Sequence, residues 1–204
     1  MEFAKTLDRE ELDLDPITQF KTWFDQALQA DLHEATGMTL ATVTAEGKPC
    51  SRIVLLKSFD RDGFVFFTNY NSKKAEELAN NPWASLTFWW DKLERQVHIL
   101  GKVEKIDAAS SEQYFNSRPR GSQIGAWASP QSQELANREE LQQSIQAMTE
   151  KFEGKSVPCP EHWGGYLVRP ERIEFWQGRS DRLHDRFTFE LSEQKEWEVK
   201  RLAP

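Results

Sequence analysis

Residues 38–68 read MTLATVTAEGKPCSRIVLLKSFDRDGFVFFT and indicate the fold class. The apolar and β-branched residues of this stretch recur with the period of two that is typical of strands. We expect strands at Met38–Thr44, Ser51–Lys57 and Phe64–Thr68, with a hairpin turn at Glu46-Gly47. Short strands joined by tight turns predict an antiparallel sheet.

The rest of the chain adds helices one at a time between further strands. Helices are predicted after the Asp15-Pro16 cap, at Lys73–Asn80, from Asp107 to Asn116, and from Pro130 to Phe152. Further strands are predicted at Ala84–Trp90, Arg95–Ile106, Tyr166–Val168, Arg172–Gln177, Phe187–Leu191 and Trp197–Leu202, and Ser117–Pro130 is predicted to be a functional loop. This order indicates an α+β fold, mainly antiparallel β and barrel-like, in one domain over residues 1–204.

The composition narrows the class of protein. With 204 residues and 38% hydrophobic content, one globular domain can bury a sizeable core. A formal net charge of −7 argues against a nucleic-acid binder, and two cysteines favour a reducing cytoplasm over a disulfide framework. No apolar run approaches the ~20 residues of a membrane helix, and residues 1–10 lack a signal-peptide core. We therefore expect a soluble cytoplasmic protein without membrane partners.

Two pairs of cations, and one segment that contains two arginines, could bind phosphate. Arg52 and Lys57 flank an apolar strand, where they either reach solvent or meet an anion. Lys73 and Lys74 lie in the first turn of a predicted helix, where positive charge opposes the helix dipole unless an anion binds there. The segment from Tyr114 to Gln123 adds a phenol, two guanidiniums and two hydroxyls, which suits a second phosphate or a solvated turn.

Near the C-terminus three basic residues alternate. If Arg182-Leu-His-Asp-Arg186 forms a strand, Arg182, His184 and Arg186 share one face. His184 is then a possible acid or base, although a lone histidine is more often structural. Cys159 and His162 have the spacing of zinc ligands, but no second pair completes a site, so no metal is expected.

Several motifs together resemble the pyridoxamine 5'-phosphate oxidase family across nearly the whole chain. The matching segments are Arg52–Lys57, Phe67–Asn69, Ser72–Ala75, Leu93–Val97, Tyr114–Arg120, Ser122–Trp127, Trp163–Gly165, Glu174–Gly178, Arg182–Arg186 and Arg201–Pro204. Each motif alone is weak, but their number and order make the resemblance specific. It implies an FMN-binding split barrel with flanking helices, working as a homodimer with shared active sites.

The resemblance also implies roles for individual residues. Arg52 and Lys74 would hold the FMN phosphate with help from Lys73 and Ser132. The residues implied to line the flavin are Arg52, Ile53, Val54, Leu55, Leu56, Lys57, Phe67, Thr68, Gln96, Gln131, Trp176 and Arg186. Lys57, Tyr114, Arg118 and Ser122 would bind the substrate phosphate. Arg182 and His184 would lie against the pyridine ring and position its C4' atom.

The implied reaction oxidises pyridoxamine or pyridoxine 5'-phosphate to pyridoxal 5'-phosphate. Oxygen would accept the electrons and give hydrogen peroxide, and the amine substrate would also release ammonia. The family usually has Ser-Arg-Lys where this chain has Ser72-Lys73-Lys74, so one planar guanidinium is replaced. Residues 1–14 are expected to form a flexible arm, and His98 is assigned no role.

Three alternatives remain open from the sequence. A related split-barrel flavin reductase would need the Arg52–Lys74 group but not Tyr114, Arg118, Arg182 and His184 together. A non-catalytic carrier of FMN or pyridoxal phosphate would be yellow but would not turn over. An acidic β-barrel interaction module would be colourless.

Overall fold

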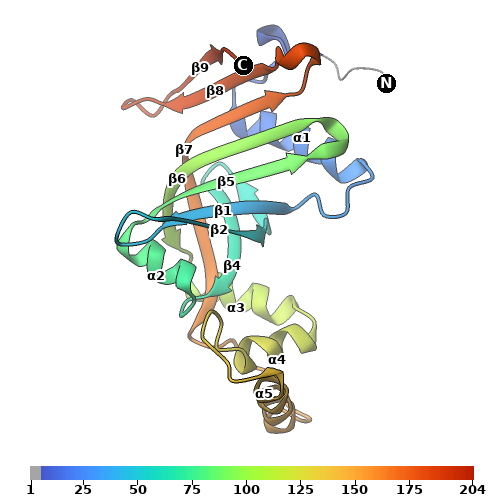
Figure 1. Cartoon of the computed structure of the whole chain (residues 1–204), viewed down its shortest axis with the longest axis vertical. Helices are drawn as coiled ribbons and strands as arrows, with labels where there is room; N and C mark the ends of the chain where they lie inside the picture. The colour runs from blue at the N-terminus through green and yellow to red at the C-terminus, as the bar shows by residue number, and fades with distance from the viewer. Residues whose placement is uncertain (1–5) are drawn as a thin grey trace.

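One nine-stranded antiparallel sheet organises the protein, whose computed structural model describes residues 6–204 (Figure 1). The strands are β1 (Gly37–Val43), β2 (Pro49–Leu55), β3 (Ser58–Asp60), β4 (Gly63–Asn69), β5 (Trp83–Trp90), β6 (Arg95–Lys105), β7 (Trp163–Gln177), β8 (Asp185–Leu191) and β9 (Trp197–Leu202). The α-helices are α1 (Pro16–Gln29), α2 (Lys73–Asn80), α3 (Ala108–Ser117), α4 (Arg120–Ala128) and α5 (Arg138–Lys151). The predicted α+β class with mainly antiparallel strands is confirmed.

Strand β7 divides the sheet into two arms. One edge of β7 pairs with β6, whereas the other edge pairs with β4 at residues 163–168 and with β8 at residues 172–177. Between these segments Pro170 lacks an N–H group, and the register with β6 shifts at Leu100/Gly101. A Cβ atom on Gly101 would lie 2.0 Å from the Arg169 carbonyl oxygen, so this bend requires glycine. The β4–β3 and β8–β9 arms therefore lie at opposite ends of β7 (Figure 1).

Helix α1 supplies much of the core. The Asp15 side chain accepts a hydrogen bond from the Ile17 N–H, and Pro16 occupies the first turn, as predicted. Phe20 is fully buried, and its ring centroid lies 4.9 Å from those of Phe59 and Phe64. Burial of a side chain of this size stabilises the fold by about 1.5–3 kcal/mol. No helix among residues 6–204 is long and apolar enough to cross a bilayer.

The N-terminal segment is described from residue 6 onward. Leu7 and Leu12 are buried in the main core. The Leu7 N–H donates to Asp185 Oδ2 at 3.3 Å, which attaches the segment to the start of β8. The expected arm is therefore anchored at Leu7 and Leu12, and residues 1–5 lie outside the described part.

Two helix predictions are wrong. The segment expected to be a loop, Ser117–Pro130, contains α4, because Ile124 and Ala128 are buried one turn apart. The helix expected from Pro130 begins at Arg138 instead. Ser132 has a φ of 71°, which no continuous helix allows, and the Asn137 side chain caps the new start by accepting from the Glu140 N–H.

Two strand predictions shift. The second strand runs over Pro49–Leu55 rather than Ser51–Lys57, and Lys57 lies beyond its end, where its N–H donates to the Val65 carbonyl. The two strands predicted around Pro170 are one continuous β7. Pro170 is tolerated within it because it sits where β7 exchanges β4 for β8.

Candidate active site

A cavity of about 750 Å³ lies beside β2 and β4. It gathers most of the predicted site residues: Arg52, Ile53, Val54, Leu55, Lys57, Phe67, Thr68, Lys73, Lys74, Tyr114, Arg118, Ser122, Gln131 and Ser132. Its lining includes five Lys or Arg side chains, and none of the described residues lining it is an Asp or Glu. Such a cavity suits a ligand that carries more than one negative charge.

One end of the cavity is built around Lys74. Its Nζ atom lies 3.1 Å from each of Thr68 Oγ1, Ser72 Oγ and Gln131 Oε1. These partners come from β4, the start of α2 and the loop before α5. Burial, and to a lesser degree the charge of Arg52, lowers the pKa of Lys74. An anion bound here would relieve both effects.

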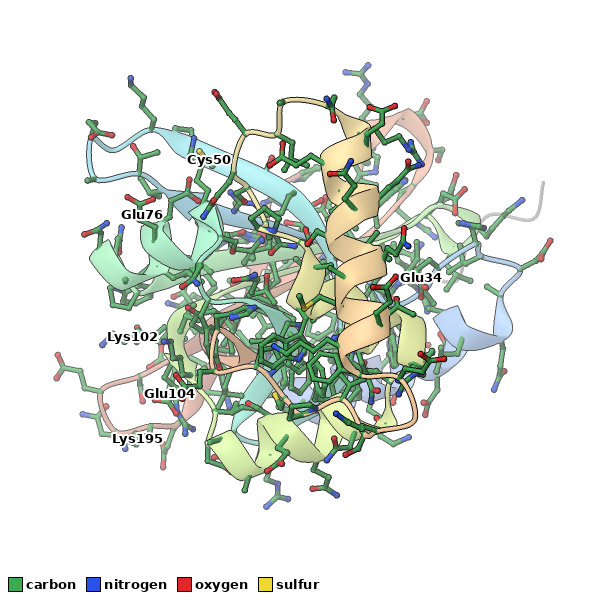
Figure 2. The ribbon with its side chains drawn as sticks, turned by 90° about the horizontal axis from the view of Figure 1, so that it is seen from below. Glu34, Cys50, Glu76, Lys102, Glu104 and Lys195 are labelled. Atoms are coloured by element: carbon green, nitrogen blue, oxygen red, sulfur yellow. The ribbon has the colours of Figure 1, made fainter. Side chains whose placement is uncertain are left out.

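Arg52 is oriented by a buried carboxylate outside the cavity. Its Nη2 atom donates to Glu77 Oε2 at 2.9 Å, and its Nη1 atom donates to Thr42 Oγ1. Burial raises the pKa of Glu77, but hydrogen bonds from Thr42, Cys50 and Arg52 outweigh this and leave the pKa below its usual value. Figure 2 shows Cys50 on β2 and, on the same side of the molecule, Glu76 on helix α2, which also carries Glu77 and Lys74.

The other end of the cavity is aromatic. The rings of Phe67 and Tyr114 stack with centroids 4.0 Å apart, and Trp163 stacks on Phe67 at 5.2 Å. The Arg118 guanidinium lies 4.5 Å from the Trp163 ring, and burial lowers the pKa of Arg118. Its Nη1 atom is buried and has no hydrogen-bond partner among residues 6–204. An unpaired buried guanidinium nitrogen is costly, so this end also suits an anion.

The remaining predicted residues do not line this cavity. Leu56 is buried in the core. Gln96 and Trp176 are paired across β6 and β7, and the Trp176 ring lies 4.4 Å from that of His184. Trp176 and His184 line a second cavity of about 240 Å³. Arg186 is the second residue of β8 and donates to Glu174 Oε1 at 2.7 Å, while Arg182 is exposed.

The strand predicted at Phe187–Leu191 is β8, which starts two residues earlier, so only the last two residues of Arg182–Arg186 lie on a strand. Ser180–Arg182 form a 3-10 turn, and β8 begins only at Asp185. Asp181 and Arg182 have φ angles of 57° and 61°, which reverse the chain into a hairpin loop. His184 Nδ1 accepts the Arg179 N–H at 3.1 Å, so in the neutral ring the proton resides on Nε2.

The two groups of site residues lie at opposite ends of β7. Trp163 begins the strand beside Arg118, and Trp176 lies near its other end beside His184. At about 3.3 Å per residue these positions are roughly 40 Å apart along the strand, shortened by its bend. One small ligand therefore cannot contact both groups within one chain.

Sequence reasoning missed several lining residues and the groups behind them. The cavity also contacts Asn69, Gly125, Ala126, Ser129 and Trp163. The motif Trp163-Gly-Gly165 was a usable signal for Trp163, because adjacent glycines in a strand indicate close packing. A Cβ on Gly164 would lie 2.3 Å from Tyr70 Oη. No local pattern marks Glu77 as the partner of Arg52.

Within residues 6–204 no group of three or more His, Cys, Asp or Glu side chains could hold a metal ion. His162 Nε2 lies 3.0 Å from the Ala126 carbonyl oxygen, and the Cys159 sulfur lies 3.8 Å from the carbonyls of Pro160 and Trp163. Both side chains thus have structural partners.

The sheet has two arms that share β7, and a cationic cavity lies beside it. This arrangement is that of the FMN-binding split barrels. The chain is similar to PhzG from Burkholderia lata in complex with tetrahydrophenazine-1-carboxylic acid, with a TM-score of 0.91, 30% identity, and coverage of 98% of this chain and 99% of that one. A pyridoxamine 5'-phosphate oxidase-related, FMN-binding protein from Nostoc punctiforme has the same fold, with a TM-score of 0.74, 17% identity, and coverage of 95% and 100%.

Sequence comparison identifies the family. The profile described as "Pyridoxamine 5'-phosphate oxidase" matches residues 24–152, and that of the "Pyridoxine 5'-phosphate oxidase C-terminal dimerisation region" matches residues 163–204. The "Pyridoxine/pyridoxamine 5'-phosphate oxidase" of Acaryochloris marina is 55% identical over 194 residues, covering 95% of this chain and 88% of the relative. The protein of the same name from Trichormus variabilis is 54% identical over 200 residues, covering 98% and 94%. The chain belongs to the pyridoxamine 5'-phosphate oxidase family, whose members are FMN-dependent oxidoreductases.

Proposed function

We propose that the protein oxidises pyridoxamine 5'-phosphate and pyridoxine 5'-phosphate to pyridoxal 5'-phosphate. Oxygen is the final electron acceptor and yields hydrogen peroxide, and the amine also releases ammonia. The observation that carries this proposal is the cavity whose lining holds two cationic groups, Lys74 with Arg52 and Arg118 on the Trp163 ring. Two phosphorylated ligands, cofactor and substrate, meet in such a cavity. The names of the relatives support the same reaction.

The donor set of the cavity fits FMN. Among residues 6–204, the Lys74 ammonium contacts only neutral oxygens at hydrogen-bonding distance, so it can take an anionic partner. Arg52, Lys73 and Ser132 line the same cavity as Lys74. Ile53–Leu55, Lys57, Phe67, Thr68 and Gln131 would border the flavin ring. FMN supplies the redox chemistry by accepting a hydride from the substrate, and the protein supplies binding and orientation.

The substrate phosphate is assigned to the aromatic end. Arg118 Nη1, which lacks a partner among the described residues, donates to a phosphate oxygen, with Lys57, Tyr114 and Ser122 as further donors. The Trp163 ring beneath Arg118 holds the guanidinium in place. This arrangement selects phosphorylated over unphosphorylated vitamin B6 forms.

We further propose that the protein is a homodimer in which each active site combines the two ends of β7 from different chains. One chain supplies the cationic cavity, and its partner supplies Gln96, Trp176, Arg182, His184 and Arg186. The separation of the two groups along β7 supports this, as does the matched dimerisation region. Ile53 beside the first group is 68% exposed and Leu183 beside the second is 69% exposed, as expected of surfaces that a second chain covers.

In the shared site, Arg182 and His184 orient the pyridine ring. His184 offers its Nε2–H as a donor because Nδ1 is already occupied by the Arg179 N–H. Arg186, held by Glu174, borders the flavin. We place the reaction in the cytoplasm, where the thiols of Cys50 and Cys159, both free, remain reduced.

The pH dependence of FMN binding tests the phosphate end. Because burial lowers the pKa of Lys74, the ammonium loses its proton at lower pH than an ordinary lysine, and a bound phosphate dianion favours the protonated form. FMN affinity is therefore expected to fall as pH rises through this lowered pKa. Flavin fluorescence quenching between about pH 7 and about pH 10 measures the dissociation constant. The controls are riboflavin, which has no phosphate, and FMN binding to Lys74→Gln. If FMN binding to the unmodified protein had the same pH slope as both controls, Lys74 would not bind the FMN phosphate.

The proposed activity is tested on the purified protein. We expect a yellow protein whose flavin absorbance bleaches on anaerobic addition of pyridoxamine 5'-phosphate and recovers in air, with oxygen consumed and peroxide formed. Unphosphorylated pyridoxamine is the matched control and should react poorly. A yellow protein without turnover would indicate a carrier, reduction by a nicotinamide donor alone would indicate a flavin reductase, and a colourless protein that does not bind FMN would overturn the proposal.

A further inference from the structure

Asp185 connects the two ends of the chain to the loop that carries Arg182 and His184. It is the first residue of β8 and is 7% exposed. Its Oδ2 atom accepts the Leu7 N–H at 3.3 Å and lies 3.5 Å from Arg179 Nε. Its Oδ1 atom accepts from Arg201 Nη2 on β9. One buried carboxylate thus joins the N-terminal segment, the loop and the C-terminal strand.

The loop itself is strained. Residues 178–184 join β7 to β8, and both Asp181 and Arg182 adopt left-handed φ angles of 57° and 61°. Such backbone conformations are unfavourable for residues other than glycine, and they persist only where surrounding contacts impose them. Neither position is a glycine, so the contacts at the ends of the loop have to supply this restraint.

Arg179 and Asp185 make the contacts at the two ends of the loop. The Arg179 backbone N–H donates to His184 Nδ1, and the Arg179 side chain pairs with the Asp185 carboxylate. Across the hairpin Asp185 is paired with Gln177, whose amide donates to the carbonyls of Leu93 and Glu94. The position of Arg179, and with it the ring orientation of His184, therefore depends on the carboxylate.

We infer that Asp185 is a positioning residue, whose carboxylate holds the 178–184 loop in the conformation that presents Arg182 and His184 to the substrate. Asp185 itself contacts neither substrate nor cofactor. The inference rests on the proposed function, because it takes Arg182 and His184 as the groups that orient the pyridine ring.

Asp185→Asn is the variant that tests this. The amide has nearly the same shape, but its NH₂ group cannot accept a hydrogen bond. That group faces either Arg201 or the Leu7 and Arg179 donors, so at least one of the carboxylate's hydrogen bonds is lost. We expect the rate of flavin reduction at saturating pyridoxamine 5'-phosphate to fall about tenfold, since a small misplacement of orienting groups has a large effect on rate. FMN affinity and the reoxidation rate should remain those of the unmodified protein.

A second readout reports on the loop without any turnover. Long-range ¹H–¹⁵N NMR spectra distinguish the ring tautomers of the chain's four histidines. In the unmodified protein His184 should carry its proton on Nε2, and in Asp185→Asn the Nδ1 signal should shift toward a mixed tautomer. A purely structural role of Asp185 would lower thermal stability but leave the His184 signal and the reduction rate of the folded fraction unchanged.

The outcomes separate this inference from the proposed function. If the unmodified protein does not oxidise the phosphorylated substrates, the function fails while the His184 signal still tests the loop. If it does, and Asp185→Asn keeps both the reduction rate and the His184 tautomer, the positioning role is overturned. Should Asp185→Asn not fold, Arg201→Gln removes one partner of the carboxylate at an exposed side chain. For Arg201→Gln we expect a smaller fall in the flavin reduction rate and a smaller shift of the His184 Nδ1 signal. An unchanged reduction rate would overturn the inference.

Discussion

Replacing Arg182 with Met is expected to slow the reduction of bound flavin by pyridoxamine 5'-phosphate about a hundredfold. Methionine keeps much of the bulk of the side chain but loses its charge and donors, so the pyridine ring is no longer fixed over the flavin. Hydride transfer depends steeply on this geometry, whereas the reaction of reduced flavin with oxygen does not involve the ring. Stopped-flow absorbance at anaerobic and aerobic conditions measures the two half-reactions separately.

The control for Arg182→Met is Arg138→Met, which removes an exposed arginine at the start of α5. It should match the unmodified protein in both half-reactions. If Arg182→Met slowed only reoxidation, or neither step, Arg182 would not orient the substrate.

Replacing Arg118 with Ala is expected to lower kcat/KM for pyridoxamine 5'-phosphate about tenfold to a hundredfold. The loss corresponds to a charge-assisted hydrogen bond of about 1.5–3 kcal/mol to the substrate phosphate. FMN should remain bound, since the contacts that hold Lys74 and Arg52 do not involve Arg118. Steady-state oxygen uptake gives the kinetic constants, and flavin absorbance gives the cofactor content.

Unphosphorylated pyridoxamine provides the internal control for Arg118→Ala. Its low kcat/KM should be the same in both proteins, because it has no phosphate for Arg118 to bind. An equal loss for both substrates would mean that the substitution disturbs the cavity as a whole, and unchanged kinetics for both would exclude Arg118 from the site.

The fold was largely predictable because its signals are local. Period-two patterns located the strands, and the caps at Asp15 and Asp107 are formed as expected, each accepting a backbone N–H of its helix. Helix α4 was missed because its Arg, Ser and Gly residues resemble a loop, and the helix depends on burying Ile124 against distant residues such as Phe152. The hairpin before β8 was missed because its left-handed positions, Asp181 and Arg182, are not glycines.

The site was only partly predictable. The types of residue around Arg52, Lys74 and Arg118 indicated anion binding, but which of them share a cavity depends on the pairing of β4 with the first half of β7. That pairing also separates them from Trp176 and His184 at the other end of the strand. The division of the site residues into two groups is therefore a property of tertiary structure that no spacing in the sequence expresses.

In the proposed homodimer, each active site combines the cationic cavity of one chain with the Trp176–His184 group of its partner. Mixing the Arg118→Ala and Arg182→Met proteins under conditions that exchange subunits tests it most directly. With random exchange half of the dimers are mixed, and each mixed dimer contains one site free of both substitutions and one with both. With shared sites, we expect recovery to about one quarter of the activity of the unmodified protein. If the mixture, with subunit exchange verified by mass, retains only the average activity of the two variants, each site is built within one chain and the sites are not shared.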